Sequence, residues 1–282
     1  MEIKSLEKTE FETIFRAFSQ AFADYEVQWN KEQLKAMLKR RGFVPELSFA
    51  AFDDNGEIVA FTFNGTGYFN GILTAYDTGT GTIKDYRGRG LATEIFETSL
   101  PYLKKNKIEQ YLLEVLQHNL KAISIYKKLG FETTREFNYF MQKRENIDSR
   151  VKNSAFSVKQ MDTIDFDSIS NFWDFHPSWQ NNTEAIKRAS EDFISLGVFN
   201  EQKLIGYCVF EPASGDITQI AVKKQNRRQG IATLMLNEVI KYNKSDTVKI
   251  VNTDILCNSI TEFLKAKNIA LKGKQFEMIK KL

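Results

Sequence analysis

The sequence is short of the residue types that build disulfide scaffolds and metal sites. Its 282 residues include only 2 cysteines and 2 histidines. Cys208 and Cys257 both lie in apolar surroundings, so we expect two buried, unpaired thiols in a reducing compartment rather than a disulfide or a nucleophile. His118 and His176 have no partner at metal-ligand spacing, and a metal site is therefore not expected.

Long apolar runs and a surplus of one charge are missing as well. No apolar stretch approaches the roughly 18 residues of a membrane helix, and no signal-peptide core follows Met1, so we expect a cytoplasmic protein without a membrane span. The 39 basic and 36 acidic residues leave a formal charge of +3. This surplus is too small to predict a nucleic-acid partner.

What is present is the composition of an ordinary globular chain that is long enough for two domains. Hydrophobic residues make up 42% and charged residues 27% of the sequence, values typical of folded proteins. The length predicts two domains that each bury a core.

A Gly-rich turn, placed between a β-rich run and a helical pattern, occurs twice with the spacing Arg-x-x-Gly-x-Ala. The two copies lie in Ile83–Thr93 and Val222–Thr233. Main-chain N–H groups at the start of a helix, unshielded where glycine stands, form a positive concave site that suits a diphosphate. Glycines also punctuate ordinary loops, but the repetition favours a binding site.

Other segments repeat in the same order, which predicts a duplicated domain. Phe22–Trp29 matches Phe172–Trp179, Glu57–Phe61 matches Lys203–Tyr207, and Arg87 matches Arg227. The predicted domains are residues 1–145 and 154–282, joined by the charged stretch from Gln142 to Asn153.

Each copy predicts an α+β fold with a mixed, mostly antiparallel sheet flanked by helices. Pro101 should kink or end the third helix near Leu100, and Asn30 should cap the second helix with Gln33 three residues on. The strongest local signal is the Asp53–Gly56 turn of a hairpin. In chain order the first copy predicts helices at 11–22 and after 30, a hairpin at 47–63, a strand region at 68–83, a helix from 91, a strand at 110–115, a helix at 120–129 and strands at 131–141.

Both turns resemble the acyl-CoA-binding motif of the GNAT (Gcn5-related N-acetyltransferase) superfamily, Gln/Arg-x-x-Gly-x-Gly/Ala between a strand and a helix. A Walker A loop would need Lys-Ser/Thr after its last glycine, and a Rossmann fingerprint would need three glycines. The resemblance implies a tandem GNAT protein that uses acetyl-CoA as cosubstrate. It also implies transfer of the acetyl group to a primary amine by direct attack in a ternary complex.

The resemblance assigns cofactor residues in both copies. In this family the strand before the turn splays from its neighbour and holds the pantetheine arm, although Gly79 and Gly81 would equally relieve crowding at an edge. The first set is Gly81, Ile83, Arg87, Gly88, Arg89, Gly90, Leu91, Ala92, Thr93, Asn119 and Tyr126. The candidate second set is Val222, Arg227, Arg228, Gln229, Gly230, Ile231, Ala232 and Asn258.

A second GNAT-like motif runs from His118 to Phe131, with Asn119 opening a helix and Gly130 ending it. The family places a phenol such as Tyr126 beside the cofactor sulfur. A thiolate of pKa about 8.5 can take a proton from a phenol of pKa about 10, so Tyr126 is the expected catalytic acid. The second copy has Leu264 at this place when Asn258 is matched to Asn119 with one deletion. We therefore expect catalysis in the N-terminal copy.

No motif singles out the general base or the residues of the acceptor site. Glu26, Asp77 and Glu114 are candidate bases, although a water chain is equally possible and a solvated surface position is favoured for each of the three carboxylates. The expected substrate-binding residues are Tyr25, Glu26 and Trp29, although Trp29 and Trp179 occupy matching places and are also read as core anchors.

Two other function classes remain open. One is a non-catalytic acyl-CoA-binding sensor or scaffold with degenerate copies. The other is an aminoacyl-tRNA-dependent transferase built from two GNAT-like units, which should carry a basic patch that this sequence lacks. The expected partner is a small-molecule or peptide amine, with the protein acting as a monomer or a homodimer.

Overall fold

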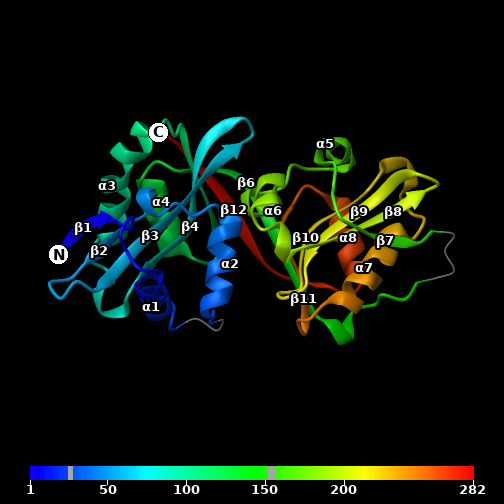
Figure 1. Ribbon diagram of the computed structural model, residues 1–282, viewed down its shortest axis with the longest axis horizontal. Coiled ribbons are helices and arrows are strands. Elements are labelled where there is room, and N and C mark those ends of the chain that lie inside the picture. The colour runs from blue at the N-terminus through cyan, green and yellow to red at the C-terminus, as the bar shows by residue number, and fades with distance from the viewer. Residues whose placement is uncertain (25–27, 152–155) are drawn as a thin grey trace. The chain divides into compact units, whose positions relative to one another are not determined.

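The protein forms two compact units. A computed structural model describes residues 1–24, 28–151 and 156–282. The N-terminal unit consists of Met1–Thr134 and Phe276–Leu282, and the C-terminal unit consists of Arg135–Gln275. Figure 1 shows strands flanked by helices in each of them. The α+β architecture and the mixed sheets agree with the fold predicted for each copy.

The N-terminal unit begins with a strand, β1, that was not predicted, and then follows the predicted order of elements. Its local signals behave as expected: Asn30 and Gln33 form the capping box of α2, and Gly56, in the hairpin turn, has φ +80°. The elements are β1 (Glu2–Ser5), α1 (Phe11–Ala21), α2 (Lys31–Arg41), β2 (Phe49–Phe52), β3 (Ile58–Phe69), β4 (Ile72–Thr82), α3 (Leu91–Lys105), β5 (Gln110–Leu116), α4 (Leu120–Lys128) and the first residues of β6 (Glu132–Lys143), which continues into the C-terminal unit.

Of the two outcomes predicted for Pro101, a kink or an end of α3 near Leu100, the early end is wrong. The helix continues through Pro101 to Lys105. Pro101 is exposed, whereas Leu103, two residues later, is fully buried. We infer that burial of Leu103 outweighs the cost of the missing backbone donor.

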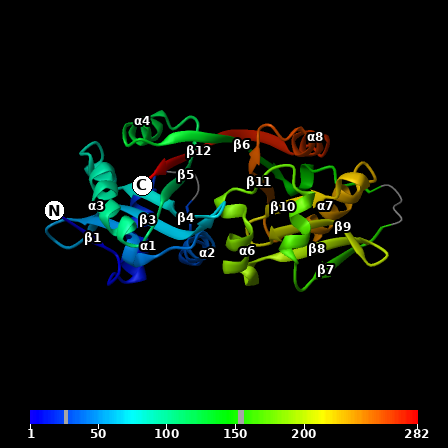
Figure 2. The same cartoon turned by 90° about the horizontal axis from the view of Figure 1, so that it is seen from above.

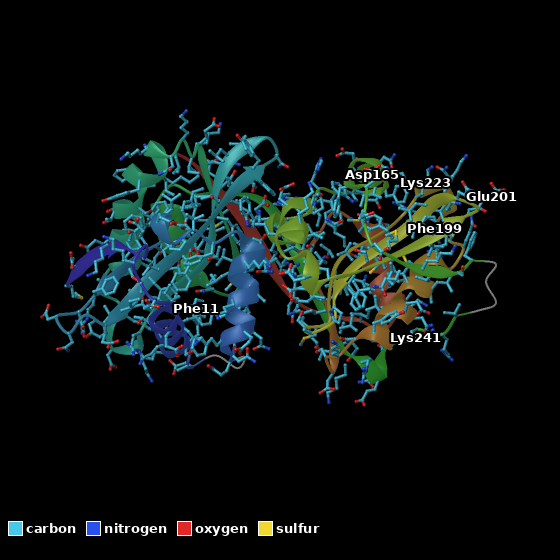
Figure 3. All side chains as sticks on the ribbon, in the orientation of Figure 1. Phe11, Asp165, Phe199, Glu201, Lys223 and Lys241 are labelled. Atoms are coloured by element: carbon cyan, nitrogen blue, oxygen red, sulfur yellow. The ribbon has the colours of Figure 1, made fainter. Side chains whose placement is uncertain are left out.

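Helices cover both faces of the N-terminal sheet. On one face α1 and α2 pack on β2 and β3 around Phe61 and Phe63. Figure 3 labels Phe11 at the start of α1, and the Lys35 ammonium of α2 lies 5.1 Å from its ring centre. On the other face α3 and α4 pack around Phe96 and Phe131, and Figure 2 shows α4 across the strands from α2.

The C-terminal unit repeats this plan with shorter helices on one face. In its sheet the neighbouring strands are β6, β11, β10, β9, β8 and β7. Its elements are β7 (Val158–Met161), α5 (Phe166–Ile169), α6 (Thr183–Arg188), β8 (Ile194–Asn200), β9 (Lys203–Glu211), β10 (Asp216–Val222), α7 (Ile231–Tyr242), β11 (Thr247–Asp254), α8 (Asn258–Ala266) and β12 (Ala270–Lys281).

The central parallel pair of strands diverges in both units. The pairing of β4 with β5 covers Thr74–Tyr76, although β4 continues to Thr82. In the C-terminal unit β10 and β11 pair at Asp216 and Lys249. The strand also bulges just beyond the paired part, at Thr78 in β4 and at Thr218 in β10. The splaying of the strand before the Gly-rich turn, which the family resemblance implied, is therefore present in both units.

Hairpin registers confirm the internal repeat. Phe61 pairs with Gly81 in the first copy, and Tyr207 pairs with Ala221 in the second. Phe61 and Tyr207 are as far apart in the sequence as the matched segments Glu57–Phe61 and Lys203–Tyr207. Gly81 and Ala221 are as far apart as Arg87 and Arg227 of the two Gly-rich turns. The repeat is thus a duplication of structure as well as of sequence.

The units do not coincide with the ranges 1–145 and 154–282 suggested by the sequence. After Thr134, β6 enters the C-terminal unit, where it pairs antiparallel with β11. The end of β12 returns to the N-terminal unit, where the Leu282 amide donates to the Glu109 carbonyl at 2.9 Å. Each unit is thus completed by a strand from the other half of the sequence, because strand pairing rather than chain order decides membership of a sheet.

This exchange makes the last residues important for the N-terminal unit. Met278 is fully buried in the cluster that contains Tyr111 and Ile123. We expect Met278→Ala to destabilise this unit by about 2–5 kcal/mol, measured as an earlier first transition in urea. Lys281→Ala, at an exposed position near the chain end, is the control and should change stability by less than about 0.5 kcal/mol. Equal effects of the two variants would show that the strand end is not packed.

None of the helices in the described ranges is both long enough and apolar enough to cross a membrane.

Candidate active site

The first Gly-rich turn presents main-chain donors at the start of α3. Gly88 and Gly90 have φ +79° and +81°, values that favour glycine. No atom lies within 4 Å of where a side chain on either would begin. The first helical bond runs from the Glu94 amide to the Gly90 carbonyl, so helix geometry leaves the N–H groups of residues 91–93 without intrahelical partners. The turn is therefore shaped to receive an anion.

The Arg87 side chain is directed at the protein itself. Its guanidinium donates to the Thr82 carbonyl at 3.1 Å, to the Ala21 carbonyl at 2.9 Å and to Asp24 at 3.1 Å. Arg87 thus ties the end of α1 to the end of β4, and contact of this guanidinium with a diphosphate would require these bonds to break. The Arg89 guanidinium lies 4.8 Å from the centre of the Tyr86 ring and donates to the Asp85 carbonyl.

Other residues of the predicted first set serve packing. A side chain on Gly81 would begin 2.6 Å from the Phe61 ring and 3.0 Å from Ala21, so the absence of a side chain there relieves crowding, as the alternative reading held. Leu91 is buried and Ile83 packs against the cluster of α1 and α2. Ala92 and Thr93 are half-buried in the first turn of α3. These residues can offer a ligand main-chain atoms more readily than side chains.

Tyr126 and Asp77, separate in sequence, meet beside the bulge of β4. The Tyr126 hydroxyl donates to Asp77 Oδ2 at 3.3 Å, and Thr80 Oγ1 donates to the same oxygen at 2.8 Å. Asp77 Oδ1 is buried and has no hydrogen-bond partner among the residues that the structure describes. Burial raises the pKa of Asp77 to about 6, against hydrogen bonds from Thr80 and Tyr126 that favour the carboxylate. A buried carboxyl that titrates near neutrality is typical of a proton-transfer site.

A second carboxylate and a cation lie on the same stretch of the sheet. The Tyr76 hydroxyl donates to Glu114 Oε2 at 3.2 Å, and Arg41 of α2 donates to the carbonyl of the bulged Thr78 at 2.8 Å. Asp77 and Glu114 were both candidate bases, and the structure gives Asp77 the direct bond to the predicted acid.

The expected acceptor residues are placed less directly. Tyr25 and Glu26 fall outside the described residues. Trp29 packs in the core with its ring centre 5.9 Å from that of Phe18. Asn119 caps α4, where its side chain accepts from the Ala122 amide at 3.2 Å.

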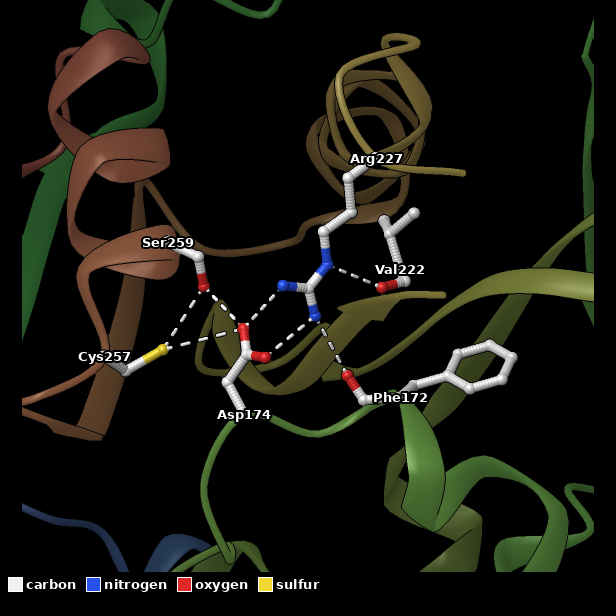
Figure 4. A network of polar contacts seen from close by, with 6 residues as sticks. All are labelled: Phe172, Asp174, Val222, Arg227, Cys257 and Ser259. Atoms are coloured by element: carbon white, nitrogen blue, oxygen red, sulfur yellow. Dashed lines mark hydrogen bonds and ion pairs between the residues drawn. The ribbon is translucent and has the colours of Figure 1, made fainter. Parts of the chain in front are cut away.

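The second turn repeats the arginine arrangement and extends it (Figure 4). Arg227 donates to the Val222 carbonyl at 3.0 Å and to the Phe172 carbonyl at 3.2 Å, and its Nη1 lies 2.8 Å from Asp174 Oδ2. Ser259, on α8, donates to the same carboxylate at 2.7 Å. Burial opposes ionisation of Asp174, but the bonds from Arg227 and Ser259 outweigh it and hold the pKa of this carboxyl below its ordinary value.

A cavity of about 650 Å³ lies in the cleft of the C-terminal unit, and its lining comes from β10, β11, α7 and α8 and also from Phe172–Phe175, Pro177 and Asn181. Of the predicted second set, the residues on its wall are Val222, Arg227, Arg228, Gly230, Ile231, Ala232 and Asn258. Arg228, at the place of Gly88, has φ +65°, and Gly230 opens α7 with φ +82°. The second turn thus borders an open space of ligand size.

The start of α8 corrects the predicted alignment of the second motif. Its capping position is Cys257 rather than Asn258. The helix ends match as well: the Phe131 amide bonds to the Tyr126 carbonyl, and the Ile269 amide bonds to the Leu264 carbonyl. Asn119 precedes Phe131 by the same number of residues as Cys257 precedes Ile269, so the two copies of the motif align without a deletion. Leu264, fully buried, keeps the place of Tyr126.

The structure also shows where the two cysteines lie and which side chains could hold a metal ion. Cys208 and Cys257 are buried and unpaired, as predicted. Cys257 Sγ lies 3.3 Å from Ser259 Oγ on the cavity wall. Within the described ranges no group of His, Cys, Asp and Glu side chains could hold a metal ion.

Sequence reasoning missed Arg41 and Thr80. Arg41 stands in a basic helix end, which predicts a solvated face, and Thr80 reads as an ordinary strand residue. No local pattern marks either of them, since their roles depend on bonds to residues far away in the sequence.

Comparison with known proteins agrees with this geometry. The profile described as the Acetyltransferase (GNAT) family matches residues 11–131 and 158–256, which is one match in each copy.

Two curated proteins share a segment of this sequence. N-alpha-acetyltransferase 30 of Schizosaccharomyces pombe is 32% identical over 98 residues, which are 34% of this chain and 65% of that protein. N-alpha-acetyltransferase MAK3 of Arabidopsis thaliana is 30% identical over 98 residues, or 34% of this chain and 51% of that protein. The chain therefore spans less than two thirds of the length of either relative.

Solved structures share the fold over the full length of the chain. A tandem GNAT protein from the clavulanic acid biosynthesis pathway superposes with a TM-score of 0.74 at 13% identity, covering 99% of this chain and 98% of that one. A GCN5-related N-acetyltransferase from Sphaerobacter thermophilus gives a TM-score of 0.71 at 12% identity, with 99% and 95% covered. With a Gly-rich turn, a splayed strand pair and a family match in each copy, the chain belongs to the GNAT acetyltransferase family as a tandem member.

Proposed function

We propose that the N-terminal unit transfers an acetyl group from acetyl-CoA to a primary amine by direct attack in a ternary complex. The observation that carries this proposal is the Tyr126–Asp77 pair at the bulge of β4, because it places a proton donor and a proton acceptor at the splayed strands. The turn at Gly88 and Gly90 would hold the pyrophosphate through main-chain N–H groups.

Tyr126 supplies the proton that the leaving group needs. The amine nitrogen bonds to the thioester carbon and gives a tetrahedral oxyanion, which main-chain N–H groups on the splayed strand would stabilise. The carbon–sulfur bond then breaks and releases CoA thiolate. Proton transfer from the Tyr126 hydroxyl neutralises that thiolate and leaves a tyrosinate.

Asp77 completes the proton balance. Its unpartnered Oδ1 accepts the proton that the attacking amine must lose, directly or through a water molecule, and Asp77 then returns a proton to Tyr126 through Oδ2. With its pKa raised to about 6, this carboxyl is better matched to an α-amino group of pKa about 8 than to a lysine of pKa about 10.4. The relatives named N-alpha-acetyltransferases support the same choice. The proposed acceptor is therefore the α-amine of a peptide or of a small molecule.

A kinetic assay tests this function. Purified protein is given acetyl-CoA and a panel of α-amines and ε-amines, and both CoA thiol release and acetylated amine are measured. We expect amine-dependent release with intersecting initial-velocity lines, as a ternary complex requires. Parallel lines would indicate an acetylated enzyme instead, and release without acetylated amine would contradict transfer.

A further inference from the structure

The bulge of β4 decides which side chains meet at the proposed proton-transfer pair. In the pairing of β3 with β4 the register shifts after Phe63, so that Thr78 is left as an extra residue. Successive side chains of a regular strand point to opposite faces of the sheet, which would separate residues 77 and 80. The extra residue places both on one face, where Thr80 Oγ1 donates to Asp77 Oδ2 at 2.8 Å. The polar group formed by Asp77, Thr80 and Tyr126 therefore depends on the bulge.

A side chain of α2 supplies a partner for the main chain of this bulge. Thr78 is 1% exposed, so its carbonyl, which the bulge removes from the ladder, needs a donor within the protein. The Arg41 guanidinium donates to this carbonyl from Nη1 at 2.8 Å. The Thr78 hydroxyl in turn donates to the Phe63 carbonyl at 3.0 Å. The extra residue is thus held from α2 and from β3.

The backbone that carries Arg41 is fixed on the sheet. Directly after α2, the Gly42 carbonyl accepts from the Thr66 amide of β3 at 3.0 Å. A side chain on Gly65 would collide with the Arg41 carbonyl oxygen, so the end of α2 and β3 are in main-chain contact there. The guanidinium is therefore mounted on a rigid stretch of backbone, as a residue that positions another group must be.

The charge of Arg41 also acts on the ionisation of Asp77. Burial raises the pKa of Asp77 to about 6, whereas the hydrogen bonds from Thr80 and Tyr126 and, more weakly, the positive charge of Arg41 lower it. Without this charge the pKa of Asp77 would be higher. The other titratable side chains in this part of the sheet are Tyr76, Tyr111, Glu114 and Tyr126.

We infer that Arg41 is a positioning residue of the proposed acetyl transfer: by closing the bulge at Thr78, it holds Asp77 in place against Tyr126. The inference rests on the proposed function, since Arg41 affects turnover through that pair. Arg41 needs no contact with either substrate for this role. Its loss should therefore change the rate and the pH dependence of transfer rather than the binding of acetyl-CoA.

Kinetics of Arg41 variants test this role. In Arg41→Gln, kcat with α-amines should fall about 10- to 100-fold, as for a reacting group displaced by about 1 Å, while calorimetry should show an affinity for acetyl-CoA near that of wild type. The acidic limb of the kcat/KM profile should move to higher pH, because Asp77 must lose its proton to act as base. Arg41→Lys keeps the charge, so its limb should stay near that of wild type and its kcat should recover in part.

Arg16→Gln is the matched control for these variants. Arg16 lies on α1, its side chain is 50% exposed, and the substitution removes the same charged group away from the bulge. Its rate and its pH profile should equal those of wild type.

Carbon-13 NMR tests the inference without turnover. Aspartate carboxyl and tyrosine Cζ carbons are labelled, and Asp77→Asn and Tyr126→Phe identify the two resonances. In wild type the Tyr126 resonance should follow the titration of Asp77, because the two groups share a hydrogen bond. In Arg41→Gln, Asp77 should titrate at higher pH and the response of Tyr126 should be lost. Should circular dichroism show this variant unfolded, Arg41→Met, which keeps an apolar stem, replaces it with the same expectations.

The outcomes separate this inference from the proposed function. If wild type acetylates amines and a folded Arg41→Gln keeps its kcat and its pH profile, the inference fails and the proposed function stands. If the NMR changes occur but wild type transfers acetyl to none of the amines, the proposed function fails and the structural role of Arg41 stands. An unchanged response of Tyr126 in the folded variant would also overturn the inference.

Discussion

Tyr126→Phe should lower kcat by about 10²- to 10⁴-fold, the usual contribution of a positioned acid, with little change in the affinity for acetyl-CoA. The phenyl ring keeps the contact with Phe131, whose ring centre is 5.6 Å away. The lost hydroxyl removes the proton for the departing thiolate and one donor to Asp77. Initial rates with saturating amine, together with calorimetric binding of acetyl-CoA, measure the two effects separately.

Tyr102→Phe provides a matched control for this result. Tyr102 lies on α3, is 49% exposed and undergoes the same loss of one hydroxyl, so its kcat should stay near that of wild type. A Tyr126→Phe enzyme that retains full turnover with a good amine would refute the assignment of Tyr126 as the acid. A fall in acetyl-CoA affinity that explains the whole loss would assign Tyr126 to binding instead.

Asp77→Asn should lower activity and raise stability. The amide keeps an oxygen that can accept from Thr80 and Tyr126, but it cannot take up the amine proton, so kcat should fall by about 10²-fold or more. The same change removes a carboxylate that is costly to ionise where it lies. At pH 7 the free energy of unfolding should therefore rise by about 1–3 kcal/mol, since one pKa unit corresponds to about 1.4 kcal/mol.

The pH dependence of this gain has a definite sign. The pKa of Asp77 is about 6 in the folded protein against an ordinary 3.8, so between these values the folded state binds more protons than the unfolded one. The contribution of Asp77 to the free energy of unfolding of the wild-type protein therefore falls as the pH rises from about 4 to about 6, and it is constant above pH 6. The stabilising effect of Asp77→Asn should be full above pH 6 and vanish below about pH 4.

Urea unfolding at several pH values, combined with rate measurements, tests both parts. Asp54→Asn serves as the control, because the Asp54 side chain is 96% exposed and its loss should leave rate and stability nearly unchanged. An Asp77→Asn protein that is less stable at pH 7 would show that the ionised carboxylate is a net stabilising group. Unchanged turnover would remove Asp77 from the proton path.

Sequence patterns predicted local structure correctly where that structure depends only on nearby residues. The capping box at Asn30 and the hairpin turn at Gly56 depend on residues within a few positions of each other, and both form as predicted. The repeated turn and its neighbouring strand and helix also follow from short patterns. The family resemblance was therefore readable from the sequence.

Contacts between residues that are distant in the sequence could not be predicted in the same way. Arg87 looked like a ligand for phosphate, but its guanidinium bonds to Asp24 and to the carbonyl of Ala21. Gly81 looked like an opening for a ligand, yet the Phe61 ring occupies the space beside it. For Arg87 and for Gly81, a ligand-binding role and a structural role are both chemically reasonable from the sequence alone. The tertiary structure shows which residues they contact.

By itself the sequence determined that this chain is a tandem α+β protein with two Gly-rich turns, because the repeated segments, the hydrophobic period and the turn residues can be identified without knowledge of long-range contacts. Only the tertiary structure decided which carboxylate meets Tyr126, which strands complete each unit, and that Arg41 binds the bulge of β4. Those outcomes depend on strand pairing and burial among residues distant in sequence, and burial is also what raises the pKa of Asp77.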